Sequence, residues 1–414
     1  MQFRKCIIKR LKLPKVRAIS SILLSLFVVF LLSGFESYNS DDLYLYQWGL
    51  KNNGTFLVDE DALKKNHLPI YFYDSANNSA FFNDEEVIAH FKEKNPNSAA
   101  VFSLKDVDIK WEKGYDLFKS IPSSRDVIIA LIDTGVDVTH KDLIDSIWIN
   151  DKEIANNNID DDLNGYIDDV FGYNFNGKNG DVMPQSITEA HGTHAAGIMV
   201  SKIGDGGIKG IGYDSHIKLM PLKVLDSNEN GYMSSVVEAI IYARKHGAKI
   251  CNISLGTYVY DESIDNVIRN NPDMLFVVSA GNGMNFVGYS LDDRDVYPAK
   301  LNYSNVITVS NISFNGERYV SANYGSYVDL FAPGTYILST APFNNYAYLT
   351  GTSMSSPFVT ATAAMLYSRF PNVTPQSIKQ IINDSATPMP GVYGLCKSNG
   401  MLNVYNAMLL ASTY

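Results

Sequence analysis

Five short apolar runs, separated by segments with helical spacing, dominate the sequence from residue 126 onwards. In the first, Asp126-Val-Ile-Ile-Ala-Leu-Ile132, six apolar residues follow the aspartate, and most of them are β-branched. Such a run is typical of a strand that is buried on both faces of a parallel sheet. The other runs are 217–224, 250–255, 275–280 and 306–310, and helical patterns cover 194–201, 234–246 and 261–270. This alternation predicts an α/β protein with a doubly wound, mostly parallel central sheet and helices on both faces.

Three polar motifs stand where a predicted strand ends or a predicted helix begins. Asp133 directly follows the first run, at the edge where open α/β sheets place their sites. His191 starts the motif His-Gly-Thr-His-Ala-Ala-Gly, which opens an Ala- and Gly-rich helical pattern. Ser353 lies in Gly-Thr-Ser-Met-Ser-Ser-Pro, just before another helical pattern. A carboxylate, an imidazole and a hydroxyl at element ends are the groups that nucleophilic acyl transfer requires.

The serine motif by itself has two interpretations. Ser353 could be the N-cap of a buried helix, or it could be a nucleophile at the start of that helix. The other two motifs favour the nucleophile. In that arrangement His191 takes the proton of Ser353, while Asp133 fixes the tautomer of the imidazole and stabilises its charge. The chain order Asp, His, Ser is one of the orders known for this constellation.

These three motifs, in this order, resemble the signature motifs of the subtilisin-like serine peptidases, the subtilases. The resemblance extends from about Asp106 to Ala411, and residues 44–54 resemble the start of many mature subtilase domains. It implies a subtilisin-like fold and a serine endopeptidase that hydrolyses peptide bonds through an acyl-enzyme. The residues Asp133, His191 and Ser353 would be its triad. His194, in the same motif as His191, is expected to pack on its helix.

The resemblance also assigns residues that hold the substrate. Asn282, in Ser-Ala-Gly-Asn-Gly, could be a plain Asn-Gly turn, but it matches the oxyanion-hole asparagine of the family. Its amide and the backbone N–H of Ser353 would bind the developing negative charge. The segment Ser254, Leu255 and Gly256 resembles the strand edge to which extended peptide adds as a further strand. This segment and Ala280-Gly281 are expected to flank the pocket for the residue that precedes the scissile bond.

An acidic stretch, 292–298, is expected at the floor or rim of this pocket. It contains Asp292, Asp293 and Asp295. These carboxylates would favour a basic substrate residue if they faced the pocket. The alternative is a solvated acidic loop without a role in specificity.

A second acidic stretch, 160–169, predicts a calcium site. It reads Asp-Asp-Asp-Leu-Asn-Gly-Tyr-Ile-Asp-Asp, with oxygen ligands at alternate positions and a glycine at the turn, like the first half of an EF-hand loop. Phe171 stands at the twelfth position, so the stretch is not an EF-hand, and an acidic turn without metal is the alternative. It resembles the acidic insertion of many bacterial subtilases, which implies structural Ca²⁺. The candidate ligands are Asp160, Asp162, Asn164 and the Tyr166 carbonyl, with Asp168 or Asp169 completing the shell.

A second calcium site is a further expectation. Asp142 matches a calcium ligand of the family, and Asp205, in Gly204-Asp205-Gly206, is a candidate partner. Asp41 or Asp42 near the mature-like start would complete this site.

The charge of the chain is unevenly distributed. The net charge is −10, yet residues 1–17 hold seven Lys and Arg and no acid, so the rest carries 27 basic against 44 acidic residues. This acidic body excludes nucleic acid as an expected partner. The apolar run 18–32 behind the basic stretch predicts a signal peptide. Because residues 33–36 offer no clean cleavage site, an uncleaved membrane anchor is the alternative.

Three parts are therefore expected: a signal peptide or membrane anchor (1–35), an N-terminal extension (36–107) and the catalytic domain (108–414). The extension has a family-like start at 43–54, followed by an unassigned insertion in which Asn83-Asp-Glu-Glu86 predicts a short helix over 84–94. The folded propeptide of most secreted subtilases is not recognisable here. Cys251 and Cys396 could form a disulfide, although a buried free thiol at Cys251 fits its apolar run better.

The expected protein is a monomer that is extracellular or anchored at the cell surface, with membrane contact only through its N-terminal segment. Its partners would be polypeptides bound in extended form. A non-catalytic binding protein with a subtilase-like domain is the alternative class.

Overall fold

The computed structural model describes residues 30–31, 43–54, 56–58, 70–72, 101–204, 206–227, 230–283 and 287–414. Most of the predicted leader, the predicted helix 84–94, Asp41, Asp42 and Asp205 lie outside the described residues.

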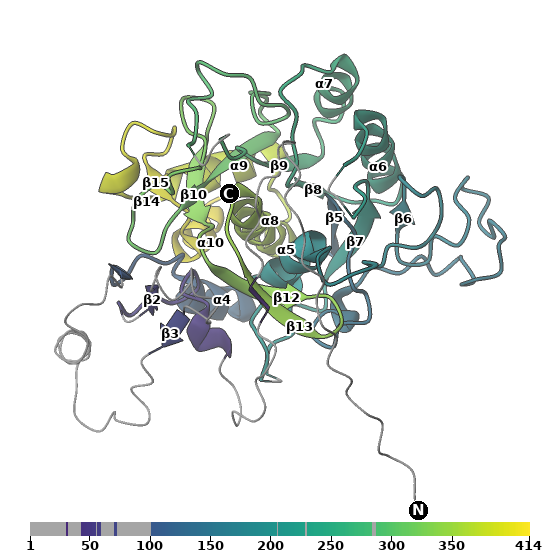
Figure 1. Ribbon diagram of the computed structural model, residues 1–414, viewed down its shortest axis with the longest axis horizontal. Coiled ribbons are helices and arrows are strands. Elements are labelled where there is room, and N and C mark those ends of the chain that lie inside the picture. Colours follow the sequence, from purple (N-terminus) through teal and green to yellow (C-terminus); the bar gives the residue numbers. More distant parts are fainter. Residues whose placement is uncertain are drawn as a thin grey trace, which may run out of the picture.

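A nine-stranded sheet forms the centre of the molecule, in the order β14-β15-β11-β10-β9-β8-β5-β7-β6 (Figure 1). The strands are β5 (Val127–Asp133), β6 (Tyr173–Asn174), β7 (Ile217–Lys223), β8 (Ile250–Ile253), β9 (Leu275–Ser279), β10 (Val306–Ile312), β11 (Leu330–Pro333), β14 (Thr387–Pro388) and β15 (Gly400–Met401). Every neighbouring pair is parallel except β14–β15. The predicted doubly wound sheet is confirmed, and all five apolar runs are strands.

The order of the strands reverses at β5, which lies between β7 and β8. After β5 the chain forms the edge strand β6 and then β7, which lies between β6 and β5, and it returns to build the other half through β8, β9 and β10. Open α/β sheets bind their ligands at such a switch point, outside the carboxyl ends of the strands. Asp133 is the last residue of β5, so it stands at this point.

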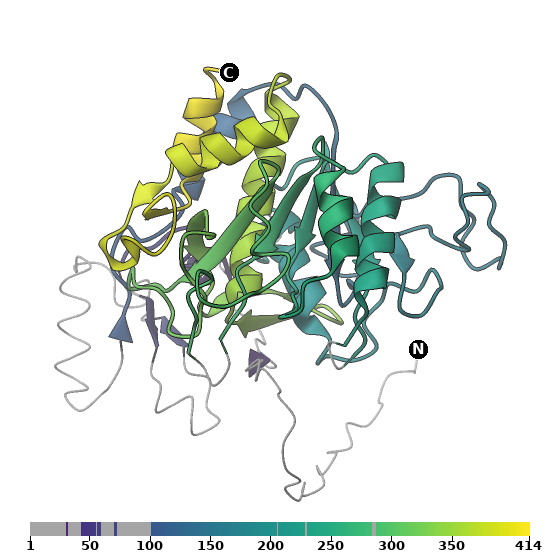
Figure 2. The same cartoon turned by 90° about the horizontal axis from the view of Figure 1, so that it is seen from above.

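Helices cover both faces of the sheet. They are α4 (Trp111–Ser120), α5 (Ala190–Val200), α6 (Met233–Lys245), α7 (Glu262–Arg269), α8 (Thr352–Arg369), α9 (Pro375–Asp384) and α10 (Val404–Ala411), with short 3-10 helices at Leu43–Tyr46, Ile144–Ser146 and Pro390–Val392. Figure 2 shows α6 and α7 on the opposite face from α8. Helix α8 is buried along its whole length, because α5, α10 and the sheet surround it. No helix within the described ranges combines the length and apolar character that crossing a bilayer requires.

A hairpin of β12 (Ile337–Ala341) and β13 (Asn345–Leu349) leads directly into α8. It packs on α5, and β1 (Phe30–Leu31) pairs antiparallel with the outer edge of β13. The hairpin therefore connects the helix that begins at residue 190 with the helix that begins at residue 352.

The two ends of the insertion lie together in a small antiparallel sheet, β3-β2-β4. Its strands are β2 (Phe56–Val58), β3 (Ile70–Phe72) and β4 (Val101–Phe102). Aromatic side chains attach the small sheet and the segment before it to the domain. Phe56 lies edge-on to Phe314 with ring centroids 5.2 Å apart, and Trp48 donates its indole N–H to Thr335 O at 2.9 Å.

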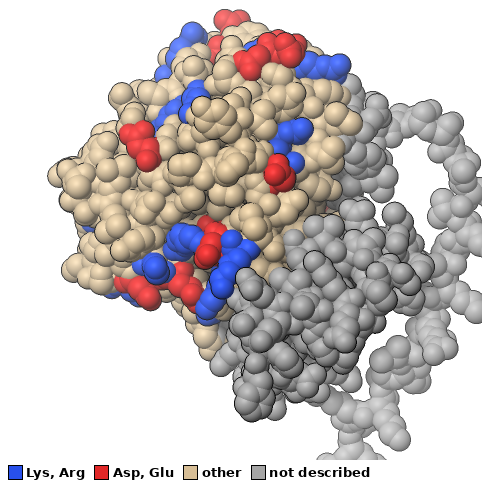
Figure 3. Space-filling view, turned by 90° about the vertical axis from the view of Figure 1, so that its left-hand side faces the viewer, with Lys and Arg blue, Asp and Glu red and all other residues tan. Residues whose placement is uncertain are grey.

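The charged side chains are mixed on the surface. Figure 3 shows Lys and Arg interspersed with Asp and Glu on a mostly uncharged face.

Both described cysteines, Cys251 and Cys396, are buried free thiols, so the alternative of a disulfide is wrong. Burial raises the pKa of each thiol. Cys251 lies in the middle of β8, in the apolar surroundings that its sequence predicted.

Candidate active site

Asp133 and His191 meet at the carboxyl edge of the sheet. His191 is the second residue of α5, and its Nδ1 lies 2.7 Å from Asp133 Oδ1. The same carboxylate oxygen accepts the backbone N–H of Thr134 at 2.7 Å, which fixes its orientation. Because a carboxylate only accepts, the proton of this contact lies on Nδ1. The neutral ring then carries its lone pair on Nε2, the nitrogen that a general base needs.

Ser353 is the second residue of α8 and follows the β12–β13 hairpin. Its hydroxyl donates to Ser254 O at 3.1 Å, and its side chain is buried apart from a small exposed part. In the first turn of a helix the backbone N–H groups have no partner within the helix, so they are available to an anion. Ser353 therefore combines a hydroxyl with the positive end of a buried helix.

Asn282 follows β9 and lies beside the first turn of α8. Its side-chain oxygen accepts the backbone N–H of Thr352 at 3.2 Å. Because the oxygen of the amide is used in this contact, the NH₂ group of Asn282 remains as a donor. The contact is made with Thr352, the residue that precedes Ser353. The sequence-predicted oxyanion-hole residue is thus brought to the candidate nucleophile.

The segment 254–256 supports the site from the neighbouring strand. Ser254 Oγ donates to Ser353 O at 3.1 Å and lies 2.9 Å from Ser356 Oγ, so it holds the first turn of α8. Leu255 and Gly256 continue beyond the end of β8. Thr257 then pairs with Tyr297 through two backbone hydrogen bonds of 2.9 and 2.8 Å.

One apolar side chain, Val296, lies between the two segments that were predicted to flank the pocket. A Cβ on Gly256 would come 3.4 Å from Val296 Cγ1, and a Cβ on Gly281 would come 3.3 Å from the same atom. Ala280, next to Gly281, is fully buried. Both segments therefore face a valine.

The acidic residues of the same stretch have partners of their own. Asp292 accepts hydrogen bonds from the hydroxyl and the backbone N–H of Ser326, and these bonds lower the pKa of its carboxyl. Asp295 accepts from Lys300 at 2.7 Å, and this bond lowers its pKa in the same way. These contacts favour a solvated acidic loop over an acidic pocket for a basic substrate residue.

His194, the other histidine of the motif, has a structural place. Its Nε2 lies 2.8 Å from Ile337 O and 3.1 Å from Ala347 O, so the ring joins α5 to both strands of the hairpin. Complete burial lowers its pKa to about 3. The ring is neutral near pH 7. Its Nε2 donates a hydrogen bond to carbonyl oxygens, so this nitrogen cannot accept a proton.

In the loop formed by the acidic stretch 160–169, the carboxylates of Asp160 and Asp162 point toward the turn at Asn164. Asp160 and Asp162 each accept the backbone N–H of Asn164, at 2.9 and 3.0 Å, and Asp160 also accepts that of Gly165 at 2.7 Å. Within the described residues, Glu153, Asp160 and Asp162 each offer a carboxylate oxygen within 4.8 Å of the others. Sequence reasoning missed Glu153, which approaches from a separate turn.

The remaining predicted ligands of this loop make other contacts. Asp168 accepts the backbone N–H groups of Asn157 and Asn158, at 3.0 and 3.2 Å. Asp169 is fully buried and accepts from Tyr242, Asn164 and Asn150, at 2.6, 2.9 and 2.9 Å. The Asn164 side-chain oxygen accepts the backbone N–H of Tyr166 at 2.7 Å.

The candidate for a second site, Asp142, is buried beside the loop that contains Gly207. Its Oδ2 accepts the hydroxyl of Tyr346 at 2.6 Å and would lie 2.4 Å from a Cβ on Gly207. Asp205, its proposed partner, is outside the described residues.

A parallel α/β sheet with an aspartate–histidine pair at its switch point, and a serine at the start of the adjacent buried helix, is the architecture of a serine hydrolase. Comparison with known proteins narrows this class. Residues 124–405 match the Subtilase family, and the chain belongs to that family.

The similar proteins are proteases. Subtilisin-like protease 1 of Plasmodium vivax is 34% identical over 304 residues, which cover 68% of this chain and 47% of that protein. The thermophilic serine proteinase of Bacillus sp. (strain AK1) is 34% identical over 283 residues, covering 68% and 61%. The chain thus spans about half the length of the Plasmodium relative.

Two solved structures share the fold. A cold-adapted subtilisin-like serine proteinase has a TM-score of 0.53 at 23% identity, covering 68% of this chain and 91% of that one. A protease from Pseudoalteromonas arctica has a TM-score of 0.58 at 23% identity, covering 73% and 94%. They confirm the subtilisin-like fold.

Proposed function

We propose that this chain is a serine endopeptidase whose triad is Asp133, His191 and Ser353. The observation that carries the proposal is the 2.7 Å contact between His191 Nδ1 and Asp133 Oδ1, next to helix α8, whose second residue is Ser353. Membership of the subtilase family supports the reaction class.

The mechanism follows from the roles of these atoms. His191 Nε2 takes the proton as Ser353 Oγ attacks the peptide carbonyl, and Asp133 stabilises the resulting imidazolium through Nδ1–H. The Asn282 amide and the backbone N–H of Ser353 receive the negative charge of the tetrahedral intermediate. The imidazolium then gives its proton to the leaving amine, and water hydrolyses the acyl-enzyme by the same steps in reverse.

Substrate would bind in extended form along 254–256, with the side chain before the scissile bond directed toward Val296. Val296, which lies between the two glycine segments, would suit an apolar side chain, because Asp292 and Asp295 already have hydrogen-bond partners. The N-terminal apolar run supports export, with the leader as signal peptide or membrane anchor.

A fluorophosphonate probe tests the proposal, since it reacts only with an activated serine. Labelling of the purified chain that disappears in Ser353→Ala is the expected result. Folded protein that is not labelled, and that still binds peptide, would instead identify a non-catalytic binding protein.

We also infer that Glu153, Asp160 and Asp162 hold a structural Ca²⁺, with the Asn164 side chain and the Tyr166 carbonyl as further oxygen ligands. Hard oxygen donors in a turn of this kind suit Ca²⁺. Three carboxylates within 4.8 Å of one another repel each other, and a bound cation would neutralise this repulsion.

Calcium is therefore expected to raise the midpoint of thermal unfolding. At free Ca²⁺ 100-fold above its Kd, binding to the folded state alone adds about 2.7 kcal/mol of stability. Unfolding followed by circular dichroism, in excess Ca²⁺ and in chelator, measures the shift. Glu153→Gln and Asp162→Asn should reduce it, whereas Asp116→Asn, at an exposed position of α4, should leave it unchanged. Equal midpoints in Ca²⁺ and in chelator would refute the site.

A further inference from the structure

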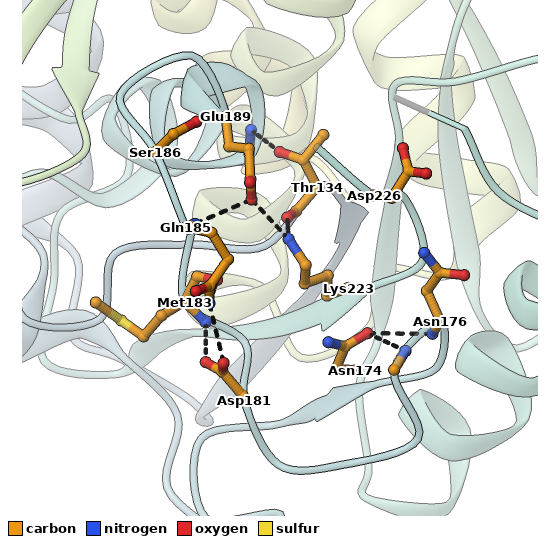
Figure 4. Close-up of polar contacts among 12 residues, drawn as sticks. Thr134, Asn174, Asn176, Asp181, Met183, Gln185, Ser186, Glu189, Lys223 and Asp226 are labelled. Atoms are coloured by element: carbon orange, nitrogen blue, oxygen red, sulfur yellow. Dashed lines mark hydrogen bonds and ion pairs between the residues drawn. The ribbon is translucent and has the colours of Figure 1, made fainter. Parts of the chain in front are cut away.

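A buried ion pair lies beside the elements that carry Asp133 and His191. The Lys223 ammonium points at the Glu189 carboxylate (Figure 4). Lys223 Nζ is 3.0 Å from Glu189 Oε2, and the two side chains are 7% and 1% exposed. Lys223 is the last residue of β7, and Glu189 directly precedes α5. The pair therefore joins the end of a strand to the start of the helix that carries His191.

The two charges depend on each other. Glu189 Oε2 also accepts the backbone N–H of Gln185 at 3.1 Å, but Glu189 Oε1 is buried without a hydrogen-bond partner among the described residues. A buried carboxylate with an unsatisfied oxygen is costly, so Lys223 is its main compensation. Burying such a pair is expensive, and in some proteins a buried pair serves to fix one arrangement of the surrounding chain.

Lys223 also reaches the residue after Asp133. It lies directly opposite Asp133 in the β5–β7 register, and its ammonium donates to Thr134 O. The Thr134 hydroxyl in turn accepts the backbone N–H of Gly192, the neighbour of His191, at 3.0 Å. One ammonium thus contacts the strand end that carries Asp133, and through Glu189 the helix end that carries His191.

The backbones at this junction are in close contact. A Cβ on Gly192 would come 2.1 Å from Gly135 O and 3.2 Å from Asp133 Oδ1. A small shift of either segment would therefore change the distance between the Asp133 carboxylate and the His191 ring.

We propose that Lys223 and Glu189 are positioning residues, which hold the Asp133 strand end and the His191 helix end at the separation that proton transfer requires. The inference rests on the proposed triad. Neither residue contacts the reacting atoms; both act through Asp133 and His191. A misplacement of about 1 Å in such a site can lower the rate by about 10²-fold.

The test compares three variants, Lys223→Met, Glu189→Gln and the double variant, by steady-state kinetics and thermal unfolding. Lys223→Met is expected to lower kcat by about 10- to 100-fold with KM nearly unchanged, because binding of extended peptide does not depend on the Asp133–His191 separation. The double variant removes both charges, so its unfolding midpoint should recover relative to Lys223→Met. Its kcat should stay low, since the ties to Thr134 and to α5 are still lost.

A matched control is available in Asp214, which forms a buried ion pair with Arg369 at 2.8 Å, at the other end of α8 from Ser353. Asp214→Asn should lower the unfolding midpoint and leave kcat unchanged. If kcat of the double variant recovers together with its midpoint, or if kcat falls equally in Asp214→Asn, the pair is structural only and the inference is overturned.

Failure of the proposed triad would look different. In that case Ser353→Ala would keep its activity. An enzyme that Ser353→Ala silences, but that retains full kcat in Lys223→Met, would overturn the positioning role alone.

Discussion

Replacing His191 by Ala is expected to lower kcat by on the order of 10⁶-fold, because the members of a catalytic triad act as a unit. The variant keeps Ser353 and the oxyanion donors but loses the base, so the serine hydroxyl stays protonated. KM should change little, since the His191 ring is not among the groups proposed to bind peptide. Hydrolysis of a chromogenic peptide under saturating conditions measures kcat directly.

His216 provides the matched control. It is a partly exposed histidine whose Nδ1 lies 2.6 Å from Asp126 Oδ1, so it repeats the histidine–aspartate contact away from the site. His216→Ala should leave kcat unchanged. A His191→Ala enzyme that keeps more than a small fraction of wild-type kcat while its unfolding midpoint is unchanged would exclude His191 as the general base.

The sheet could be predicted because its signals are local. Each apolar run became a strand within a few residues. Helix α9 likewise begins at a local signal, Thr374 followed by Pro375, with a reciprocal Thr374–Ser377 capping box. Helix α4 could not be predicted in this way. It begins after Lys110, which has φ of 55° and makes no side-chain cap, so the sequence carries no N-cap signal there.

In the candidate calcium loop, the directions of the individual carboxylates could not be predicted from the sequence. Asp168 and Asp169 are adjacent and chemically identical, yet one carboxylate caps the turn at 157–158 and the other is buried against Tyr242. Glu153, in contrast, reaches Asp160 and Asp162 from a turn seven residues before Asp160. Tertiary packing decides which way each of these carboxylates points, and the spacing of the residues in the sequence does not predict it.

The position of Lys223 in the sequence could have predicted a buried ion pair. It is the second charged residue of an otherwise apolar strand, Ile217–Lys223, and it stands level with Asp133 once the parallel register is known. A lysine at the buried end of such a strand needs a partner. The partner, Glu189, lies 34 residues earlier in the chain, and only the fold brings it near.

Replacing Asn282 by Ala is expected to lower kcat by about 10²–10³-fold, the usual effect of removing one oxyanion-hole donor. In the structure the Asn282 oxygen accepts the backbone N–H of Thr352 at 3.2 Å, so the amide is already oriented before substrate arrives. The donor acts on charge that develops only in the transition state. KM should therefore stay nearly constant while kcat and kcat/KM fall together.

Asn282→Asp separates donation from shape. Aspartate keeps the size of the side chain and its acceptor toward Thr352, but it offers no N–H and places a negative charge near the forming oxyanion. Its kcat should fall at least as far as that of Asn282→Ala. Fluorophosphonate labelling of Ser353 should slow in both variants but should not vanish, because Asp133, His191 and Ser353 remain in place. If Asn282→Asp retains wild-type kcat, the oxyanion must be stabilised by other donors, and the amide of Asn282 then serves only to hold the first turn of α8.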